Sequence, residues 1–406
     1  MSVRHRTVPF GAMLAVTVLC GSELHAAPFR PANDDVVVET LSAATRGRPA
    51  TAPRPAATTS GHADLDSSSN PELELQARVR GLIARGRQNA DPRDLGRAEA
   101  LLRAAPAVTP VPVERLVLQA TIDQSLHRFD ASVRGLDAVL AREPMHAQAR
   151  LTRATVLQVQ GHFDAAAHDC ALLARVARPL VSTTCSTSVA SLRGRAREAY
   201  VLLDFALRSA GDEQPEVLSW SRTVLAGIAE RTGRRLEAET NYRTALALAP
   251  DDPFVLASYA DLLLDAGDAR RALALVQGRR VDDNLYLREA IALKRLGDPG
   301  LATAVAELAA RFEAAHRRGQ ALHLREEARF ELQVRDDARR ALQLAQANWA
   351  VQREPADARI LFEAAQSAGD VPNTRLALQW LEAMGVMPAG NIARRSQATR
   401  VMEQQS

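Results

Sequence analysis

Glycines at a nearly regular spacing constrain the fold of this chain more than any other feature. Gly161, Gly194, Gly233, Gly267 and Gly297 follow one another at steps of 33, 39, 34 and 30 residues. A small residue stands seven positions before each glycine and an alanine five positions after it: Ala154, Thr187, Ala226, Ala260 and Ala290, then Ala166, Ala199, Ala238, Ala272 and Ala302. A period near 34 residues predicts a stack of helical hairpins.

The composition agrees with such a stack. Hydrophobic residues make up 47% of the 406 residues, but aromatic residues only 4%. A core of Ala, Leu and Val favours closely packed helices over a sheet sandwich. The length would allow two or three globular domains, and the repeat favours one array instead. With 51 basic and 48 acidic side chains, the net charge of +3 is too small to indicate a nucleic-acid partner.

The unit around Gly233 shows the repeat most clearly. The residues at the small and large positions of this unit, together with the proline that closes it, are Leu225-Ala226, Ala229, Gly233, Ala238, Tyr242, Ala245-Leu246 and Pro250. In these positions the chain resembles the tetratricopeptide repeat family, over roughly residues 72 to 385. The resemblance implies an all-α, right-handed superhelix of about seven to eight helix pairs. In this family small residues let the two helices of a unit approach closely, and Pro144, Pro250 and Pro355 would close three of the units.

Three units depart from the pattern. The 39-residue step predicts an insertion near 210–215, and the 30-residue step predicts a shortened unit near 278–280. The unit from Leu324 to Pro355 lacks the glycine between its helices and has the turn Arg335-Asp336-Asp337 instead.

The N-terminus has the pattern of an export signal. Arg4 and Arg6 precede an apolar run from Val8 to Cys20, and Ala26 offers a small residue for cleavage. We expect a signal peptide over 1–26, a disordered linker rich in Pro, Ala, Thr and Ser over 27–70, the solenoid over 71–387 and a polar tail over 388–406. The chain would then be periplasmic or secreted, without membrane insertion after cleavage; an uncleaved N-terminal anchor is the alternative.

Two cysteines would remain after cleavage, in a compartment that permits disulfides. The family's architecture places Cys170 on the second helix of one unit and Cys185 on the first helix of the next. Because those helices face each other, we expect a disulfide, with two separate buried thiols as the alternative.

Motifs for catalysis or cofactors are missing from the sequence. It contains no glycine-rich nucleotide loop, no H-E-x-x-H and no G-x-S-x-G. His162 and His168 point to different helix faces, and nothing completes a metal site with His316 and His323. We therefore expect no catalytic residue, cofactor or metal. Glu326, Glu327 and Glu331 with Arg325, Arg329 and Arg335 would form a salt-bridged helix face.

In tetratricopeptide arrays the first helix of each unit lines the concave surface. Carrying that register across predicts a groove that is neutral and polar in its first units and charged in its later ones. Its expected lining is Thr121, Gln124, Ser125, Thr155, Gln158, Thr184, Ser188, Ser191, Glu230 with Arg231, Asp261 with Asp265, and Arg288 with Lys294. A solvated inner face without a ligand is the alternative.

These patterns predict a non-enzymatic scaffold or adaptor that binds a protein or peptide in its concave groove. An accessory factor for envelope or polysaccharide assembly, which contacts glycan, is the second hypothesis, and an enzyme with an unrecognised site is the third. Helical repeats can also read RNA, but the expected export and the acidic residues beside the arginine pairs argue against nucleic acid. Nothing indicates a small-molecule substrate.

Overall fold

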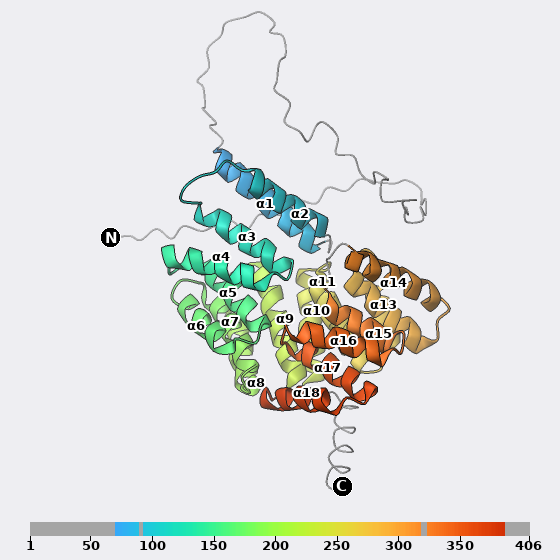
Figure 1. The fold of residues 1–406 in the computed structure, drawn as a ribbon. Helices are drawn as coiled ribbons and strands as arrows, with labels where there is room; N and C mark the ends of the chain where they lie inside the picture. The colour runs from blue at the N-terminus through green and yellow to red at the C-terminus, as the bar shows by residue number, and fades with distance from the viewer. Residues whose placement is uncertain (1–69, 89–91, 318–322, 386–406) are drawn as a thin grey trace, which may run out of the picture. The chain divides into compact units, whose positions relative to one another are not determined.

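The computed structural model describes residues 70–88, 92–317 and 323–385. The expected signal peptide and linker lie outside the described residues, as do the last residues of the expected solenoid and the polar tail. Within the described ranges all regular secondary structure is helical. The helices form antiparallel pairs that follow one another from α1 to α18 (Figure 1). The all-α superhelical class is confirmed.

The helices of the described ranges form nine pairs, against the seven to eight expected. Their bounds are α1 (Pro71–Gln88), α2 (Pro92–Ala104), α3 (Val113–Ser125), α4 (Phe129–Arg142), α5 (Ala147–Val159), α6 (Phe163–Leu173), α7 (Pro179–Ser191), α8 (Ala196–Ser209), α9 (Pro215–Arg231), α10 (Arg235–Leu248), α11 (Pro253–Asp265), α12 (Ala269–Val276), α13 (Asp283–Leu296), α14 (Leu301–Arg317), α15 (Leu324–Gln333), α16 (Ala338–Trp349), α17 (Pro355–Ala368) and α18 (Val371–Ala383).

The repeat glycines stand in the turn between the two helices of a pair. Gly161, Gly194, Gly233, Gly267 and Gly297 have φ of +80°, +77°, +75°, +81° and +66°. Side chains disfavour this left-handed region, so the periodic glycines are a requirement of the backbone. In the α15–α16 turn, which lacks a glycine, Asp336 takes the same conformation with φ of +59°.

The departures from the repeat affect particular helices. The long step gives α9 seventeen residues and a loop over 210–214, while the short step leaves α12 with eight residues. Pro355 is the first residue of α17, so it begins that helix instead of closing the preceding one. Proline is tolerated there because the first N–H groups of a helix have no partner within it.

The core is a row of clusters between successive helices. The largest runs from α7 to α15, and its members include Leu203, Ala226, Ala238, Tyr286 and Phe330. Alanines at the repeat positions, such as Ala226 and Ala238, are fully buried. They keep the paired helices close, which is why so few aromatic residues are needed.

Candidate functional site

The odd-numbered helices carry the residues expected to line the concave face. Several of them contact one another in succession along the chain, as α3, α5 and α7 do, and again α11, α13, α15 and α17. Polar side chains bridge these helices directly. We refer to this surface of α3 to α17 as the inner face.

Hydroxyl groups in the first part of the inner face donate hydrogen bonds to backbone carbonyls of their own helices. Thr121 donates to the carbonyl of Val117 at 2.8 Å, and Thr155 donates to that of Leu151 at 3.0 Å. Ser125 donates to Thr121 and accepts from Arg87 of α1. Their lone pairs remain as acceptors, a property that residue type alone does not reveal. Gln124 is half-buried beside them.

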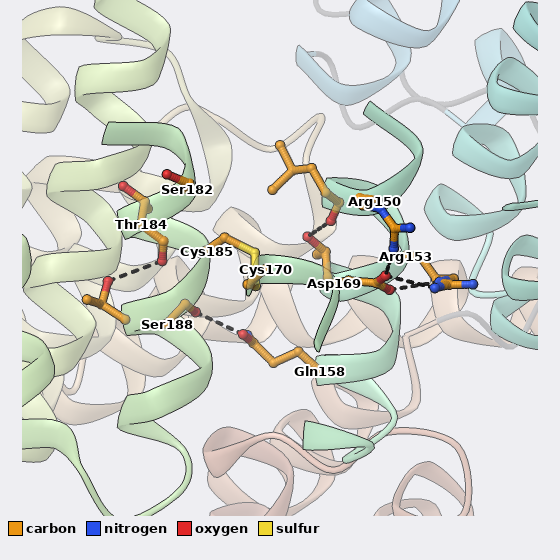
Figure 2. The surroundings of a disulfide bond; sticks show 12 residues. Arg150, Arg153, Gln158, Asp169, Cys170, Ser182, Thr184, Cys185 and Ser188 are labelled. Atoms are coloured by element: carbon orange, nitrogen blue, oxygen red, sulfur yellow. Dashed lines mark hydrogen bonds and ion pairs between the residues drawn. A yellow bond between two sulfur atoms is a disulfide. The ribbon is translucent and has the colours of Figure 1, made fainter. Parts of the chain in front are cut away.

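Helix α7 places its hydroxyls in two different environments. Thr184 is fully buried, donates to Leu180 and lies 2.7 Å from Ser221 of α9. Ser188 is only half-buried and donates across to Oε1 of Gln158 on α5 at 2.9 Å (Figure 2). Thr184 and the equally buried Ser191 are therefore packing residues in this conformation, while Gln158 and Ser188 form the surface.

Ion pairs fill the later part of the inner face. Asp261 accepts from Arg288 at 2.7 Å and from Arg329 at 2.8 Å. Burial opposes ionisation of Asp261, but the two guanidiniums outweigh it and hold its pKa below the ordinary range. Arg329 is 68 residues away along the chain. The sequence pattern placed this arginine on a salt-bridged face of α15, whereas it binds a carboxylate two units earlier.

Helix α17 contributes a second set of pairs. Arg359 binds Asp265 of α11, with one contact at 2.7 Å, and Glu363 one turn further at 2.8 Å. Arg325 contacts Glu326, Glu354 and the buried Asp357. Burial raises the pKa of Asp357 to about 6 although Arg325 opposes this. Charged residues of this face thus form ion pairs with one another across several units.

The other expected charge pairs also find partners within the chain. Arg335 binds Glu331 at 3.0 Å on the same helix, as the i,i+4 spacing predicts. Lys294 donates to the carbonyl of Val334 and to Asp336, both in or near the α15–α16 turn.

Glu230 and Arg231, at the end of α9, point to different neighbours. Glu230 accepts from the hydroxyl of Tyr242 on α10. Burial, together with repulsion from Asp265 and Asp261, raises the pKa of Glu230 to about 7. Arg231 donates through Nη2 to Ser191 on α7 at 2.7 Å. Burial lowers the pKa of Arg231.

The turn between α16 and α17 lies against the early units. The amide of Arg353 donates to the carbonyl of Val159 at 2.8 Å, and Nε2 of Gln352 is 3.1 Å from Nδ1 of His127. The ring of Trp380 is 6.4 Å from that of Phe163. The array therefore brings its last pairs back to its second and third pairs, a contact that nothing in the sequence pattern indicated.

The expected cysteine pair is joined. Cys170 on α6 and Cys185 on α7 form a disulfide with 5.5 Å between their Cα atoms (Figure 2). Beside it, the fully buried Asp169 binds Arg150 and Arg153 of α5, each with a contact at 2.7 Å. These bonds tie α5, α6 and α7 together.

No group of three or more His, Cys, Asp or Glu in the described ranges could hold a metal ion. His316 lies 2.7 Å from a carboxylate oxygen of Glu327. None of the described helices combines the length and the apolar character needed to cross a membrane.

No model of a protein family matches the sequence, and no curated protein matches it. Solved structures do. One is a thermophilic TPR protein from Thermus thermophilus, at 23% identity over 48% of this chain and 99% of that one, with a TM-score of 0.38. A tetratricopeptide repeat protein from Parabacteroides merdae matches at 14% identity over 77% and 98%, with a TM-score of 0.36.

A higher TM-score, 0.51, relates the chain to Rap protein complexed with competence and sporulation factor, at 10% identity over 78% of this chain and 99% of that one. Together with the paired helices and their turn glycines, this last likeness decides the architecture. The chain has the tetratricopeptide repeat fold. At such low identity the likeness concerns the fold of the solenoid alone.

Proposed function

We propose that the chain is a non-enzymatic scaffold that binds a protein or peptide partner along its inner face, in the periplasm. The observation that carries the proposal is the surface formed by α5, α7 and α9. There Gln158, Ser188 and Arg231 retain hydrogen-bonding atoms that the described residues leave unused. Solenoids of this kind offer extended concave surfaces to partners.

A solved structure with a similar fold supports this use of the inner face. Rap protein was solved in complex with a second molecule, the competence and sporulation factor. A partner of the present chain would meet neutral acceptors at α3 and α5 and ion pairs from α11 to α17. Such a surface suits peptide amides better than an apolar ligand.

The export pattern of the first 26 residues supports the location. N-terminal sequencing of the chain from a periplasmic fraction would test it, with a mature terminus near Ala27 as the expected result. A chain that begins at Met1 and stays with the membrane would support the uncleaved anchor instead.

Affinity capture from envelope extracts would test the binding. We expect Gln124→Ala/Gln158→Ala to lose partners that the parent chain retains. Thr240→Ala/Thr244→Ala is the matched control, since Thr240 is exposed, Thr244 is half-buried and both donate only within α10, which is not one of the inner-face helices. An unchanged partner profile would count against the inner face, and capture of glycan in place of protein would favour the envelope-assembly hypothesis.

A further inference from the structure

Arg231 forms no ion pair with a carboxylate of the described residues, unlike four other arginines of the inner face. Arg288, Arg325, Arg329 and Arg359 each form ion pairs. No ion pair joins Arg231 to any carboxylate in the described ranges. Its Nε is buried without an acceptor there, and Nη2 meets only the hydroxyl of Ser191.

An unpaired guanidinium that is removed from water is unfavourable, because it loses its hydration without gaining a counter-ion. A guanidinium has five N–H donors arranged to bind a carboxylate with two of them. The position therefore combines a desolvated cation with unused donors, and an incoming anion would offset the cost of burial.

Gln158 provides a second unused donor on the same surface. Ser188 donates to its Oε1, so the amide Nε2 of Gln158 is left with two N–H groups and no acceptor among the described residues. Ser188 and Ser191 lie one turn apart on α7, between Gln158 on α5 and Arg231 on α9. We call the surface formed by these four residues, Gln158, Ser188, Ser191 and Arg231, the donor strip; its unused donors are those of Gln158 and Arg231, since Ser188 donates to Gln158 and the buried Ser191 donates to the carbonyl of Ser188.

The chain itself already lays an acidic segment beside the donor strip. Arg353 donates its amide to the carbonyl of Val159, the residue after Gln158. Glu354 follows, close enough for its charge to act on Arg231 but beyond ion-pair distance. Its carboxylate is held instead by Arg325 and by the start of α17. The inner face thus accommodates main chain with an internal glutamate, and Arg231 still lacks a carboxylate.

We propose that the donor strip is the anchoring site for an acidic side chain of a peptide segment, with Arg231 binding the carboxylate and Gln158 donating to a neighbouring main-chain carbonyl. This inference rests on the proposed function and specifies the chemistry of the partner. The segment would run beside the α16–α17 turn, in the manner of residues 352–354.

A peptide library screened against the full chain tests the site. The probes are random hexapeptides with acetylated N-termini and amidated C-termini, so that only side chains carry carboxylates. We expect the parent chain to enrich peptides containing Asp or Glu. Arg231→Gln and, separately, Gln158→Leu should each weaken binding of the enriched peptides at least tenfold. Arg193→Gln, at an exposed arginine that pairs with the exposed Asp164, should leave binding unchanged.

Thermal unfolding separates binding from a structural role. Since Arg231 has no carboxylate to lose, Arg231→Gln should unfold at the same temperature as the parent chain or higher. Enrichment of peptides without acidic residues, or acidic peptides that bind Arg231→Gln undiminished, would overturn the site while leaving peptide binding intact. Enrichment only after the C-terminal amide is replaced by a free carboxylate would also overturn it. Retention of no peptide at all would count against the proposed function itself.

Discussion

Individual carboxylates on the inner face respond to pH in opposite directions, according to whether a guanidinium compensates their burial. Asp261 has two arginines within 3 Å and a lowered pKa. Glu230 has only the Tyr242 hydroxyl, and its pKa is raised to about 7. Asp261 therefore contributes stability above the ordinary pKa of an aspartate and loses it in acid, whereas Glu230 favours folding most when it is protonated.

Asp261→Asn should lower the free energy of unfolding by about 3 kcal/mol near neutral pH, because Arg288 and Arg329 would remain without their shared carboxylate. The deficit should begin to shrink below about pH 4, because the unfolded parent chain then binds a proton at Asp261 while the folded carboxylate, with its lowered pKa, stays ionised. Urea denaturation at pH 7 and pH 3.5 would measure both effects. Asp251→Asn, which breaks an exposed pair with Arg279, should cost less than about 1 kcal/mol. Equal losses for the two variants would contradict the account.

Glu230→Gln should change the pH dependence of stability. The folded pKa of Glu230 lies above its unfolded value of 4.5, so the parent chain loses stability as pH rises from about 5 to 8. The glutamine variant lacks this titration. Relative to the parent chain, its free energy of unfolding should therefore rise by about 1 to 3 kcal/mol across that range. Urea midpoints at pH 5 and pH 8 would show it, with the exposed Glu237→Gln as control. Parallel pH profiles for parent and variant would refute the prediction.

The turns between the helices of a pair require a residue with a left-handed backbone conformation, and in most repeats this residue is glycine. Asp336 supplies it in the α15–α16 turn at φ of +59°. Asp336→Val should lower the free energy of unfolding by about 1 to 2 kcal/mol, since a β-branched residue is strained there. Asp336→Gly should change it by less than about 0.5 kcal/mol, as relief of strain is offset by added unfolded-state entropy. Thermal denaturation would compare the two, and equal losses would show that the backbone angle is not the cause.

The disulfide between α6 and α7 links two helices of neighbouring repeats, where stability depends on contacts between adjacent units. Cys170→Ser/Cys185→Ser should lower the free energy of unfolding by about 3 kcal/mol, because the open chain gains conformational entropy when unfolded. A reductant should destabilise the parent chain by a similar amount and leave the double variant unchanged. Two titratable thiols in the oxidised, denatured parent would show that the bond is absent.

At the scale of the whole solenoid, the last pairs contact the early pairs. The contact includes the Arg353–Val159 hydrogen bond and the approach of Trp380 to Phe163. Gly161 allows it, because a Cβ there would lie 3.1 Å from Cβ of Arg353. A peptide bound as we propose, beside the α16–α17 turn, would lie next to this contact.

Trp380→Ala should loosen the contact, since the indole also packs edge-on against Trp349 at 5.4 Å. Hydrogen exchange followed by mass spectrometry should show faster exchange around Arg353, whose amide is protected by Val159. Peptides from α11 to α14 serve as the internal reference and should exchange as in the parent chain. Unaltered exchange around Arg353 would mean that the ring does not hold the contact together.

Much of the fold was predictable from the sequence because its causes are local. The spacing of Gly161 to Gly297 and the alanines around each glycine predicted the helix pairs, an insertion near 210–215 and a shortened unit near 278–280; the insertion precedes the long α9, and the shortening follows the short α12. The resemblance to the tetratricopeptide repeat family implied that Cys170 and Cys185 lie on facing helices.

The residue types of the inner face could be read from the sequence, but their partners could not. Carrying the family's register across assigned Asp261, Asp265 and Gln158 to the expected concave lining, and this assignment depends only on helical periodicity. Which arginine reaches Asp261 depends instead on the curvature accumulated over several units, as the pairs with Arg329 and Arg359 illustrate. The sequence by itself determined the repeat and its turns. Only the tertiary structure decided which charges are paired and that Arg231 is left without a carboxylate partner, because pairing depends on distances across the superhelix.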